Sequence, residues 1–424
     1  MKKNILVFPC GSEIGLDIYS SVCNSTYFHL IGGNSIDDHG RYVYKDYISG
    51  IPFASSDEFL PAMAIIVKDY HIDAIYPTLD FVITVLKEHE KELGCKVVSS
   101  SLETTRICQS KEYTYKKLKD VVLVPKIYCF PEIPLEDYPI FAKPNVGYGS
   151  RGIKKLYNRE ETALFLQGKE DIMLLEYLPG EEFTVDCFTD KGGNLLYCAA
   201  RKRNRIKNGI SVNTFFVEEQ REFRTIAEKI NEALRFRGSW FYQVKRNKND
   251  ELCLLEIASR LGGSSLLSRA VGVNLALLSL FDTFDFNVEV QRNDYRVELD
   301  RALDTKYKTN LEYDSVYCDY DDCLILEKSI VNLDMLKFLY KCVNEKKKVF
   351  LLSKHNGDLL QELKKYRIEM LFDEIIQIGE NEDKYNYIST KAPIFIDDSY
   401  AERKKIKQKM NIPVFSPEMV DVLM

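Results

Sequence analysis

The chain has 424 residues, too many for one ordinary hydrophobic core, so we expect several packed units. A hydrophobic content of 45% and a charged content of 29% are typical of a folded protein. The formal net charge of -6 argues against a dedicated nucleic-acid binder, and no stretch approaches the roughly 20 apolar residues of a membrane span. The 11 cysteines form no CxxC pair or zinc-like spacing, which favours reduced thiols in a cytoplasmic protein.

The N-terminal part of the chain predicts a small α/β domain at residues 1–105. Residues 4–8 form an apolar strand that leads into a glycine-containing turn and a helical pattern, as at the start of a Rossmann-like unit. Gly11 and Gly15 lack the full GxGxxG spacing, which disfavours a dinucleotide site. Strands are also expected at 73–80 and 95–101. Polar residues at their carboxyl ends, such as Asp80, lie where an open parallel sheet binds a small ligand.

A glycine-rich loop follows an apolar strand at residues 141–153, where the sequence reads FAKPNVGYGSRGI. Lys143 stands at the end of the strand, and Gly147, Gly149 and Ser150 lie in the loop. Glycines let backbone N–H groups approach an anion, and the lysine supplies a positive charge, so this is a phosphate cradle in outline. A plain turn fits the loop alone equally well.

Three more segments carry polar groups in unusual places. Glu176 and Glu182 flank the turn of a predicted hairpin, which alone could be only a polar hairpin. A basic run at 201–207 is usually a solvated face, but in an acidic protein it favours neutralisation of a polyphosphate or an acyl phosphate. Gln243 and Glu256 interrupt two apolar strands, which suits binding of one hard cation. An edge hairpin with one wet face is the alternative.

In order and spacing, these features resemble the ATP-grasp superfamily, in particular carboxylate–amine ligases with a carbamoyl-phosphate-synthase-type grasp domain. The resemblance covers roughly residues 1–290 and implies a Rossmann-like first domain followed by a grasp domain of two α+β subdomains at 106–295. It also implies bound ATP and Mg²⁺, small-molecule carboxylate and amine substrates, and a homodimer as one form of assembly. The alternatives are a non-catalytic ATP-binding module and an ATP-grasp kinase or carbamoylating enzyme.

The resemblance assigns roles residue by residue. The expected ATP contacts are Lys111 and Lys143 on the phosphates under the loop that contains Gly147, Gly149 and Ser150, Glu176 and Leu178 at the adenine, and Glu182 on the ribose. Gln243 and Glu256 would hold magnesium, and Arg203 and Arg260 would face the acyl phosphate. The family usually has LEINPR where this chain reads LEIASR, so Ala258 replaces an asparagine that completes the metal set. Because alanine cannot ligate, the metal site is weakened or is completed by another group.

Residues 296–311 are expected to be a polar linker, and residues 312–424 predict another α/β domain. Three expected strands in it end in polar residues. Asp319 and Asp321 follow the first, Ser353 ends the second, and Asp397 and Asp398 follow the third. Acids and a hydroxyl at the carboxyl ends of parallel strands predict a magnesium site.

This C-terminal arrangement resembles the haloacid dehalogenase superfamily. The resemblance implies Asp319 as nucleophile, Asp321 as general acid/base, Ser353 as the phosphate-binding hydroxyl, Lys384 or Lys354 as the charge-balancing lysine, and Asp397 or Asp398 as a magnesium ligand beside Asp319 and Asp321. Cys323 replaces the usual threonine. The short segment between the first two parts predicts a capless, open site on a Rossmann-like domain. We expect a bifunctional ligase and phosphatase, and the alternative is a retained fold without activity.

Overall fold

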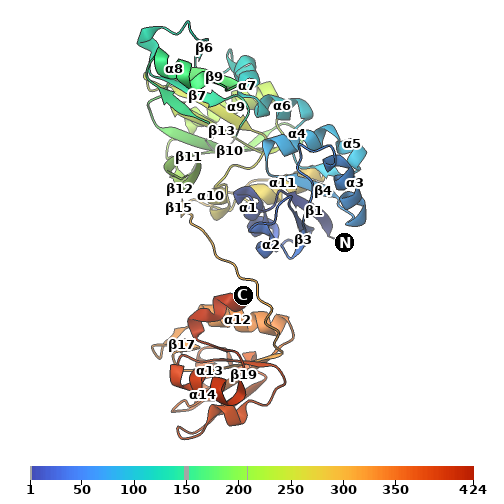
Figure 1. Ribbon diagram of the computed structural model, residues 1–424, viewed down its shortest axis with the longest axis vertical. Coiled ribbons are helices and arrows are strands. Elements are labelled where there is room, and N and C mark those ends of the chain that lie inside the picture. The colour runs from blue at the N-terminus through green and yellow to red at the C-terminus, as the bar shows by residue number, and fades with distance from the viewer. Residues whose placement is uncertain (1, 148–151, 208) are drawn as a thin grey trace. The chain divides into compact units, whose positions relative to one another are not determined.

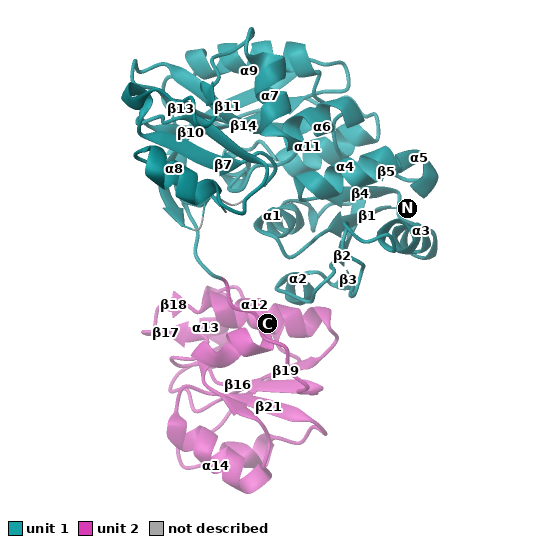
Figure 2. Cartoon of the chain, turned by 45° about the horizontal axis from the view of Figure 1, so that its top comes forward, with its two compact units in different colours: residues 1–303 teal, residues 304–424 magenta. Residues whose placement is uncertain are grey.

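The computed structural model describes residues 2–147, 152–207 and 209–424, so Gly149 and Ser150 lie outside the described residues. The chain forms two compact units, residues 1–303 and residues 304–424 (Figures 1 and 2). Within the described ranges, no helix is long and apolar enough to cross a membrane.

Unit 1 begins with a five-stranded parallel sheet of order β3-β2-β1-β4-β5. Its strands are β1 Lys3–Phe8, β2 Phe28–Gly33, β3 Asp46–Ile48, β4 Ala74–Pro77 and β5 Lys96–Val97. Its helices are α1 Glu13–Val22, α2 Gly40–Val43, α3 Phe59–Asp69, α4 Asp80–Glu88 and α5 Glu90–Leu93. The centre of β1 is fully buried, as expected for a strand covered on both faces. The Ser12 hydroxyl accepts a hydrogen bond from the Gly15 amide and caps α1 directly after β1.

A four-stranded antiparallel sheet of order β6-β9-β7-β8 follows. Its strands are β6 Ile127–Tyr128, β7 Ile140–Pro144, β8 Lys154–Leu156 and β9 Ile172–Glu176. The helices of this part are α6 Leu102–Gln109, α7 Lys111–Leu118, the 3₁₀ turn η1 Leu135–Asp137 and α8 Arg159–Leu166. Ser110 separates α6 from α7 because its hydroxyl accepts from the Tyr113 amide and caps the second helix.

The third sheet of unit 1 is six-stranded and antiparallel, with the order β14-β13-β10-β11-β12-β15. Its strands are β10 Glu182–Thr189, β11 Leu195–Lys207, β12 Ile210–Phe216, β13 Gly238–Arg246, β14 Leu252–Ala258 and β15 Glu298–Asp300. The helices here are α9 Arg221–Leu234, α10 Leu266–Ala270 and α11 Leu275–Thr283. Buried residues of α11 share one core with β1, α1 and β10, which joins the first sheet to the third. The segment expected to be a linker contains strand β15. The backbone of β15 pairs with β12 and extends the sheet, so this part of 296–311 belongs to unit 1.

Unit 2 contains a five-stranded parallel sheet of order β20-β19-β16-β21-β22 and a small hairpin of β17 and β18. The strands are β16 Ser315–Cys318, β17 Ile325–Leu326, β18 Ile330–Val331, β19 Lys348–Ser353, β20 Glu374–Gln377, β21 Pro393–Ile396 and β22 Val414–Phe415. The helices are α12 Leu333–Asn344, α13 Leu359–Lys365, α14 Tyr400–Met410 and the 3₁₀ turns η2 Glu369–Leu371, η3 Lys384–Tyr387 and η4 Pro417–Leu423. Buried residues of α12 and α13 share one core with the sheet, and Ile406 of α14 belongs to another. In Figure 2 the helices cover both faces of the sheet.

Candidate functional site

Lys143, in β7 of the four-stranded sheet, reaches β14 of the six-stranded sheet. Its Nζ donates to the Tyr115 hydroxyl at 2.8 Å and to the Leu255 carbonyl at 2.9 Å. The residue is only 7% exposed, and burial lowers the pKa of Lys143 to about 8, although Glu256 acts in the opposite direction. The lysine of one sheet therefore touches the strand of the other sheet that carries Glu256.

Lys111 stands at the start of α7, beside the beginning of the predicted cradle. Its Nζ lies 3.1 Å from the Asn145 carbonyl oxygen and 3.4 Å from that of Gly147. The Asn145 side chain in turn accepts from the Ser110 hydroxyl at 2.9 Å and from the Glu112 amide at 3.0 Å. These bonds join the first residues of the loop to the N-terminus of α7, and the charge of Lys111 helps to lower the pKa of Lys143.

Gln243 and Glu256 lie opposite each other on the neighbouring strands β13 and β14. Directly paired residues of an antiparallel sheet project from the same face, so these two side chains share one face and both are partly exposed. Oxygen atoms in such an arrangement fit one hard divalent cation. Ala258 pairs with Phe241 two residues further along β14 and offers no ligand atom.

Glu182 of β10 and Arg203 of β11 form an ion pair on the two central strands of the same sheet. The Arg203 Nε lies 3.2 Å from Glu182 Oε1, and its Nη2 donates to the Gly209 carbonyl at 2.8 Å. Burial lowers the pKa of Arg203, whereas Glu182 and Glu256 act to raise it. The carboxylate that we expected on a ribose is therefore already bound to the arginine that we expected at an acyl phosphate.

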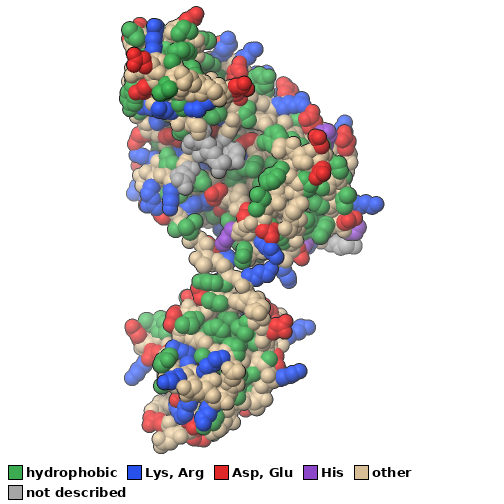
Figure 3. Space-filling view, viewed as in Figure 1, with side chains coloured by type: hydrophobic (Ala, Val, Ile, Leu, Met, Phe, Trp, Pro, Cys, Tyr) green, Lys and Arg blue, Asp and Glu red, His purple; other side chains and the backbone are tan. Residues whose placement is uncertain are grey.

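Most cations of the basic run are paired with carboxylates and not gathered at one anion site. The pairs are Arg201 with Asp186 at 2.7 Å, Lys202 with Glu181, Arg203 with Glu182 at 3.2 Å, and Arg205 with Asp300 at 2.6 Å. The cause is the pairing of β11 with the acid-bearing β10 and the position of Asp300 in β15, at the sheet edge beside β12. Acidic and basic side chains are likewise interspersed on the face of unit 1 shown in Figure 3.

Arg260 follows β14 and binds Asp80, the first residue of α4 in the N-terminal domain. Its Nε lies 3.0 Å from both Asp80 carboxylate oxygens, and its Nη2 lies 2.8 Å from Oδ2. The arginine side chain is 14% exposed and the aspartate side chain 27%. Because two guanidinium nitrogens bind the same carboxylate, the contact fixes the guanidinium plane. Asp80 and Arg260 are therefore in direct contact, with no space for a ligand between them.

The segment expected at the adenine begins at the end of β9. The Glu176 amide donates to the Lys126 carbonyl at 2.9 Å, and Leu178 is 4% exposed. The Gly180 amide donates to the Arg246 carbonyl at 3.0 Å, and a Cβ at position 180 would lie only 2.6 Å from the Arg246 Cβ. Because only glycine allows this approach, the turn is held against β13.

In unit 2, Lys384 lies between two aspartates at the carboxyl ends of neighbouring strands. Its Nζ is 2.9 Å from Asp319 Oδ1 and 2.6 Å from Asp397 Oδ2. Burial alone would lower the pKa of Lys384, but Asp319 and Asp397 outweigh it and raise that pKa. Lys354, the other lysine considered from sequence, binds Glu402 at 2.8 Å. The geometry therefore places Lys384 at the aspartates.

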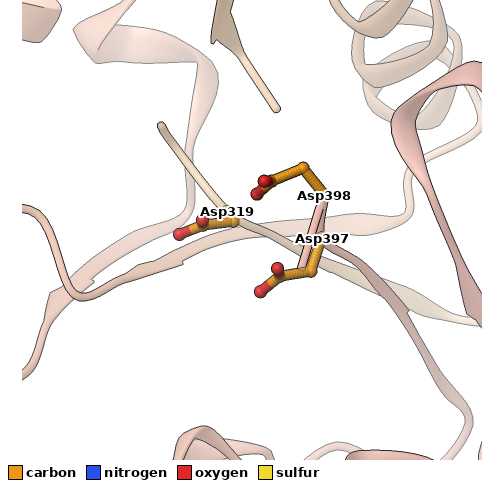
Figure 4. A group of neighbouring side chains, drawn as sticks. All are labelled: Asp319, Asp397 and Asp398. Atoms are coloured by element: carbon orange, nitrogen blue, oxygen red, sulfur yellow. The ribbon is translucent and has the colours of Figure 1, made fainter. Parts of the chain in front are cut away.

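Asp319, Asp397 and Asp398 form a group of three carboxylates (Figure 4). One oxygen from each lies within 4.8 Å of the others, which fits the all-oxygen ligand set that Mg²⁺ prefers. Burial raises the pKa of Asp397 despite the nearby Lys384, and Asp319 adds to this rise. The Ser353 hydroxyl at the end of β19 is buried and has no hydrogen-bond partner among the described residues, so it is available to a ligand.

Residues 168–308 match the family model described as ATP-grasp in the biosynthetic pathway with Ter operon. The chain contains an ATP-grasp domain. A D-alanine–D-alanine ligase of Thermotoga petrophila is 33% identical over 114 residues, an alignment that spans 24% of this chain and 37% of that ligase. The chain thus matches little more than a third of the length of this relative.

Solved structures of low sequence identity share the fold of the ATP-grasp domain. One is the biotin carboxylase domain of Hydrogenobacter thermophilus 2-oxoglutarate carboxylase, solved in complex with MgADP, ADP and bicarbonate. It superposes with a TM-score of 0.57 at 16% sequence identity, and the alignment covers 70% of this chain and 72% of the solved chain. N5-carboxyaminoimidazole synthetase from Staphylococcus aureus, complexed with ADP, has a TM-score of 0.57 at 15% identity and covers 68% of this chain and 79% of its own. L-amino acid ligase from Bacillus licheniformis has a TM-score of 0.54 at 14% identity and covers 67% of this chain and 74% of its own. The mixed α/β fold with an ATP-grasp domain is confirmed, and the haloacid dehalogenase-like resemblance stays a prediction.

Sequence reasoning missed three contacts in the candidate sites, although it had placed Asp80 near a ligand. Tyr115 of α7 receives the Lys143 hydrogen bond, Asp80 holds Arg260, and His355 contacts Asp321 in unit 2. Tyr115 lies four residues after Lys111 in α7, so helical spacing could have placed it beside the lysine that we expected at a phosphate. No local pattern pointed to the other two contacts, because each joins distant parts of the sequence.

Proposed function

We propose that the ATP-grasp domain is a magnesium-dependent ligase that activates a small carboxylate with ATP and joins it to an amine. Lys111, Lys143 and the glycine loop bind the phosphates, Glu176 and Leu178 flank the adenine, and Glu182 turns to the ribose. When bound, magnesium held by Gln243 and Glu256 supplies charge neutralisation at the phosphates.

The observation that carries this proposal is the contact of Lys143 with β14. It places a buried cation from one sheet against the strand that presents Glu256, the acid of the candidate metal pair. A triphosphate with its divalent ion needs this combination of a cation on one side and oxygen ligands on the other. The ATP-grasp match and the resemblance to carboxylate–amine ligases support the reaction class.

The chain's residues then act in two steps. Lys143 and Lys111 hold the transferring phosphoryl group while a carboxylate oxygen attacks it, which gives an acyl phosphate and ADP. Arg203 and Arg260 stabilise the acyl phosphate, and the amine displaces phosphate to form the amide. Arg203 and Arg260 can do so only if they exchange Glu182 and Asp80 for the new anion, since both guanidinium groups are already bound.

A panel of amino acids and amino alcohols, with MgATP and release of ADP as the readout, tests this proposal. We expect release that requires both a carboxylate and an amine and that falls at least about 100-fold in Glu256→Gln. Lys229→Met, an exposed lysine on α9, is the matched control and should leave the rate unchanged. Tight MgATP binding without ADP release under any condition would favour an ATP-binding module, and a phosphorylated product without amine would favour a kinase.

We propose that unit 2 is a magnesium-dependent phosphatase that acts on a phosphorylated relative of the ligase substrate or product. The specific support is the group of Asp319, Lys384 and Asp397, with the unpartnered Ser353 hydroxyl at the same sheet edge. Asp319 attacks phosphorus and forms an aspartyl phosphate, which water then hydrolyses. Asp319→Asn should abolish phosphate release, with Asp334→Asn, an exposed change in α12, as control. Unchanged release from Asp319→Asn would remove the proposed nucleophile.

A further inference from the structure

His355 binds the carboxylate of Asp321, the residue expected to act as general acid and base. The His355 Nδ1 lies 2.9 Å from Asp321 Oδ2 and 3.1 Å from Oδ1. Among the described residues, no other side chain forms a hydrogen bond with this carboxylate. The Asp321 side chain is 48% exposed and the His355 side chain only 15%, so the imidazole is the better anchored partner.

One contact holds the His355 ring and another holds its backbone. The Tyr320 ring meets the His355 ring edge to face, with centroids 4.9 Å apart and an interplanar angle of 71°. Gln377, at the end of β20, donates from Nε2 to the carbonyl oxygens of His355 and Gly357, both at 2.8 Å. The ends of β16, β19 and β20 thus cooperate to place one ring nitrogen against Asp321.

We propose that His355 is a positioning residue that holds Asp321 ready to protonate the departing oxygen of a phosphate ester, and that the site is thereby built for esters of aliphatic alcohols. This inference rests on the proposed phosphatase function of unit 2. One Asp321 oxygen accepts the hydrogen of His355 Nδ1, while the other carries the proton that the ester oxygen receives. Without this bond the exposed Asp321 carboxyl group is free to rotate, and its proton no longer points to the ester oxygen.

The atoms balance over two steps. An Asp319 oxygen bonds to phosphorus as the bond from phosphorus to the ester oxygen breaks, and that oxygen leaves as a neutral alcohol with the proton of Asp321. Water then attacks phosphorus, its proton passes to the Asp321 carboxylate, and inorganic phosphate leaves as Asp319 is restored. The first step needs a proton donor only when the leaving group is a poor one, such as an aliphatic alkoxide. An aryl or acyl leaving group departs as a stable anion.

The test compares two probe esters, glycerol 3-phosphate and 4-nitrophenyl phosphate, with the full chain and magnesium. The readout is kcat/KM, which reports only the steps up to the first irreversible release and therefore isolates departure of the alcohol. We expect His355→Ala to lose about 10- to 100-fold on glycerol 3-phosphate and less than about threefold on 4-nitrophenyl phosphate. His355→Asn, whose amide N–H can take the place of the ring N–H, should recover most of the loss.

A double variant sharpens the result. If His355 acts through Asp321, then His355→Ala should add little to the loss already caused by Asp321→Asn. Equal losses on both esters in His355→Ala and His355→Asn, or full additivity with Asp321→Asn, would overturn the positioning role. If the unmodified chain releases no phosphate from either ester or from acetyl phosphate, the phosphatase proposal fails and this inference fails with it. Release from acetyl phosphate alone would keep the phosphatase but exclude the alcohol ester as its substrate class.

Discussion

Lys143→Met is expected to stabilise unit 1 while it weakens nucleotide binding. We propose that the buried ammonium binds a phosphate, but in the free protein it costs stability, because burial lowers its pKa from 10.5 to about 8. Methionine has a similar length and no charge. The substitution leaves the two former partners of the lysine hydrogen-bonded to each other, since the Tyr115 hydroxyl donates to the Leu255 carbonyl at 2.7 Å.

The magnitude follows from the difference between the two pKa values. Each unit corresponds to about 1.4 kcal/mol, so the charged lysine costs about 3 kcal/mol near neutral pH. Between about 8 and 10.5 the unfolded chain binds more protons at this group than the folded one. The unmodified protein therefore gains stability as pH rises through this window, and its deficit against Lys143→Met closes. Loss of the charge-assisted phosphate contact should weaken MgADP binding roughly 10- to 150-fold, from about 1.5–3 kcal/mol.

Trp240, the chain's single tryptophan, provides the assay. It lies in β13 and is 1% exposed, and its ring stacks on that of Phe236 with centroids 4.1 Å apart. Its fluorescence in urea follows the unfolding of unit 1, and calorimetric titration measures MgADP binding. Lys229→Met should change neither quantity. A lower midpoint for Lys143→Met at pH 7, or a stability difference that does not close by pH 11, would show that the buried ammonium carries no such penalty.

The other predictions concern buried charges and the metal. Arg201→Met should lower the free energy of unfolding of unit 1 by about 3–5 kcal/mol, measured by tryptophan fluorescence, because Asp186 then keeps a buried charge without a partner; both side chains of the pair are 1% exposed. Adding Asp186→Leu should recover most of this stability, and a double variant less stable than Arg201→Met would contradict the reasoning. Lys384→Met should weaken phosphate release yet let magnesium raise the thermal midpoint more than in the unmodified chain, because the acids then lose their fixed cation. Chelation by EDTA should stop phosphate release and magnesium should restore it; release that persists in EDTA would argue against a metal-dependent site.

Local patterns predicted the strands that carry the proposed ATP site. The apolar run before Lys143 becomes β7, and the two strands that contain Gln243 and Glu256 pair in the register that puts both side chains on one face. These features depend on alternation of apolar and polar residues over short stretches, which the sequence displays directly. The ATP-grasp domain could therefore be recognised without knowledge of its tertiary contacts.

Partners of charged side chains could not be predicted in this way. The basic run looked like one anion site, yet Arg201 binds Asp186 across a strand pair and only Arg203 stays near Glu256. Lys384 and Lys354 were equivalent by sequence, and only their tertiary partners distinguish them, since Lys384 binds Asp319 whereas Lys354 binds Glu402. Such choices depend on which strands become neighbours, and chain order alone leaves that open.

If Arg260 binds an acyl phosphate as proposed, its salt bridge with Asp80 determines which anions can compete for the guanidinium. The two groups lie 180 residues apart in the sequence and meet through three contacts of 2.8–3.0 Å. An anion that offers one oxygen forms fewer hydrogen bonds with the guanidinium than Asp80 does, so it should not displace the aspartate. Under the proposed mechanism, a carboxylate or phosphate with two coplanar oxygens would replace Asp80 on Arg260 and leave the Asp80 carboxylate free to bind the ammonium group of the amine substrate.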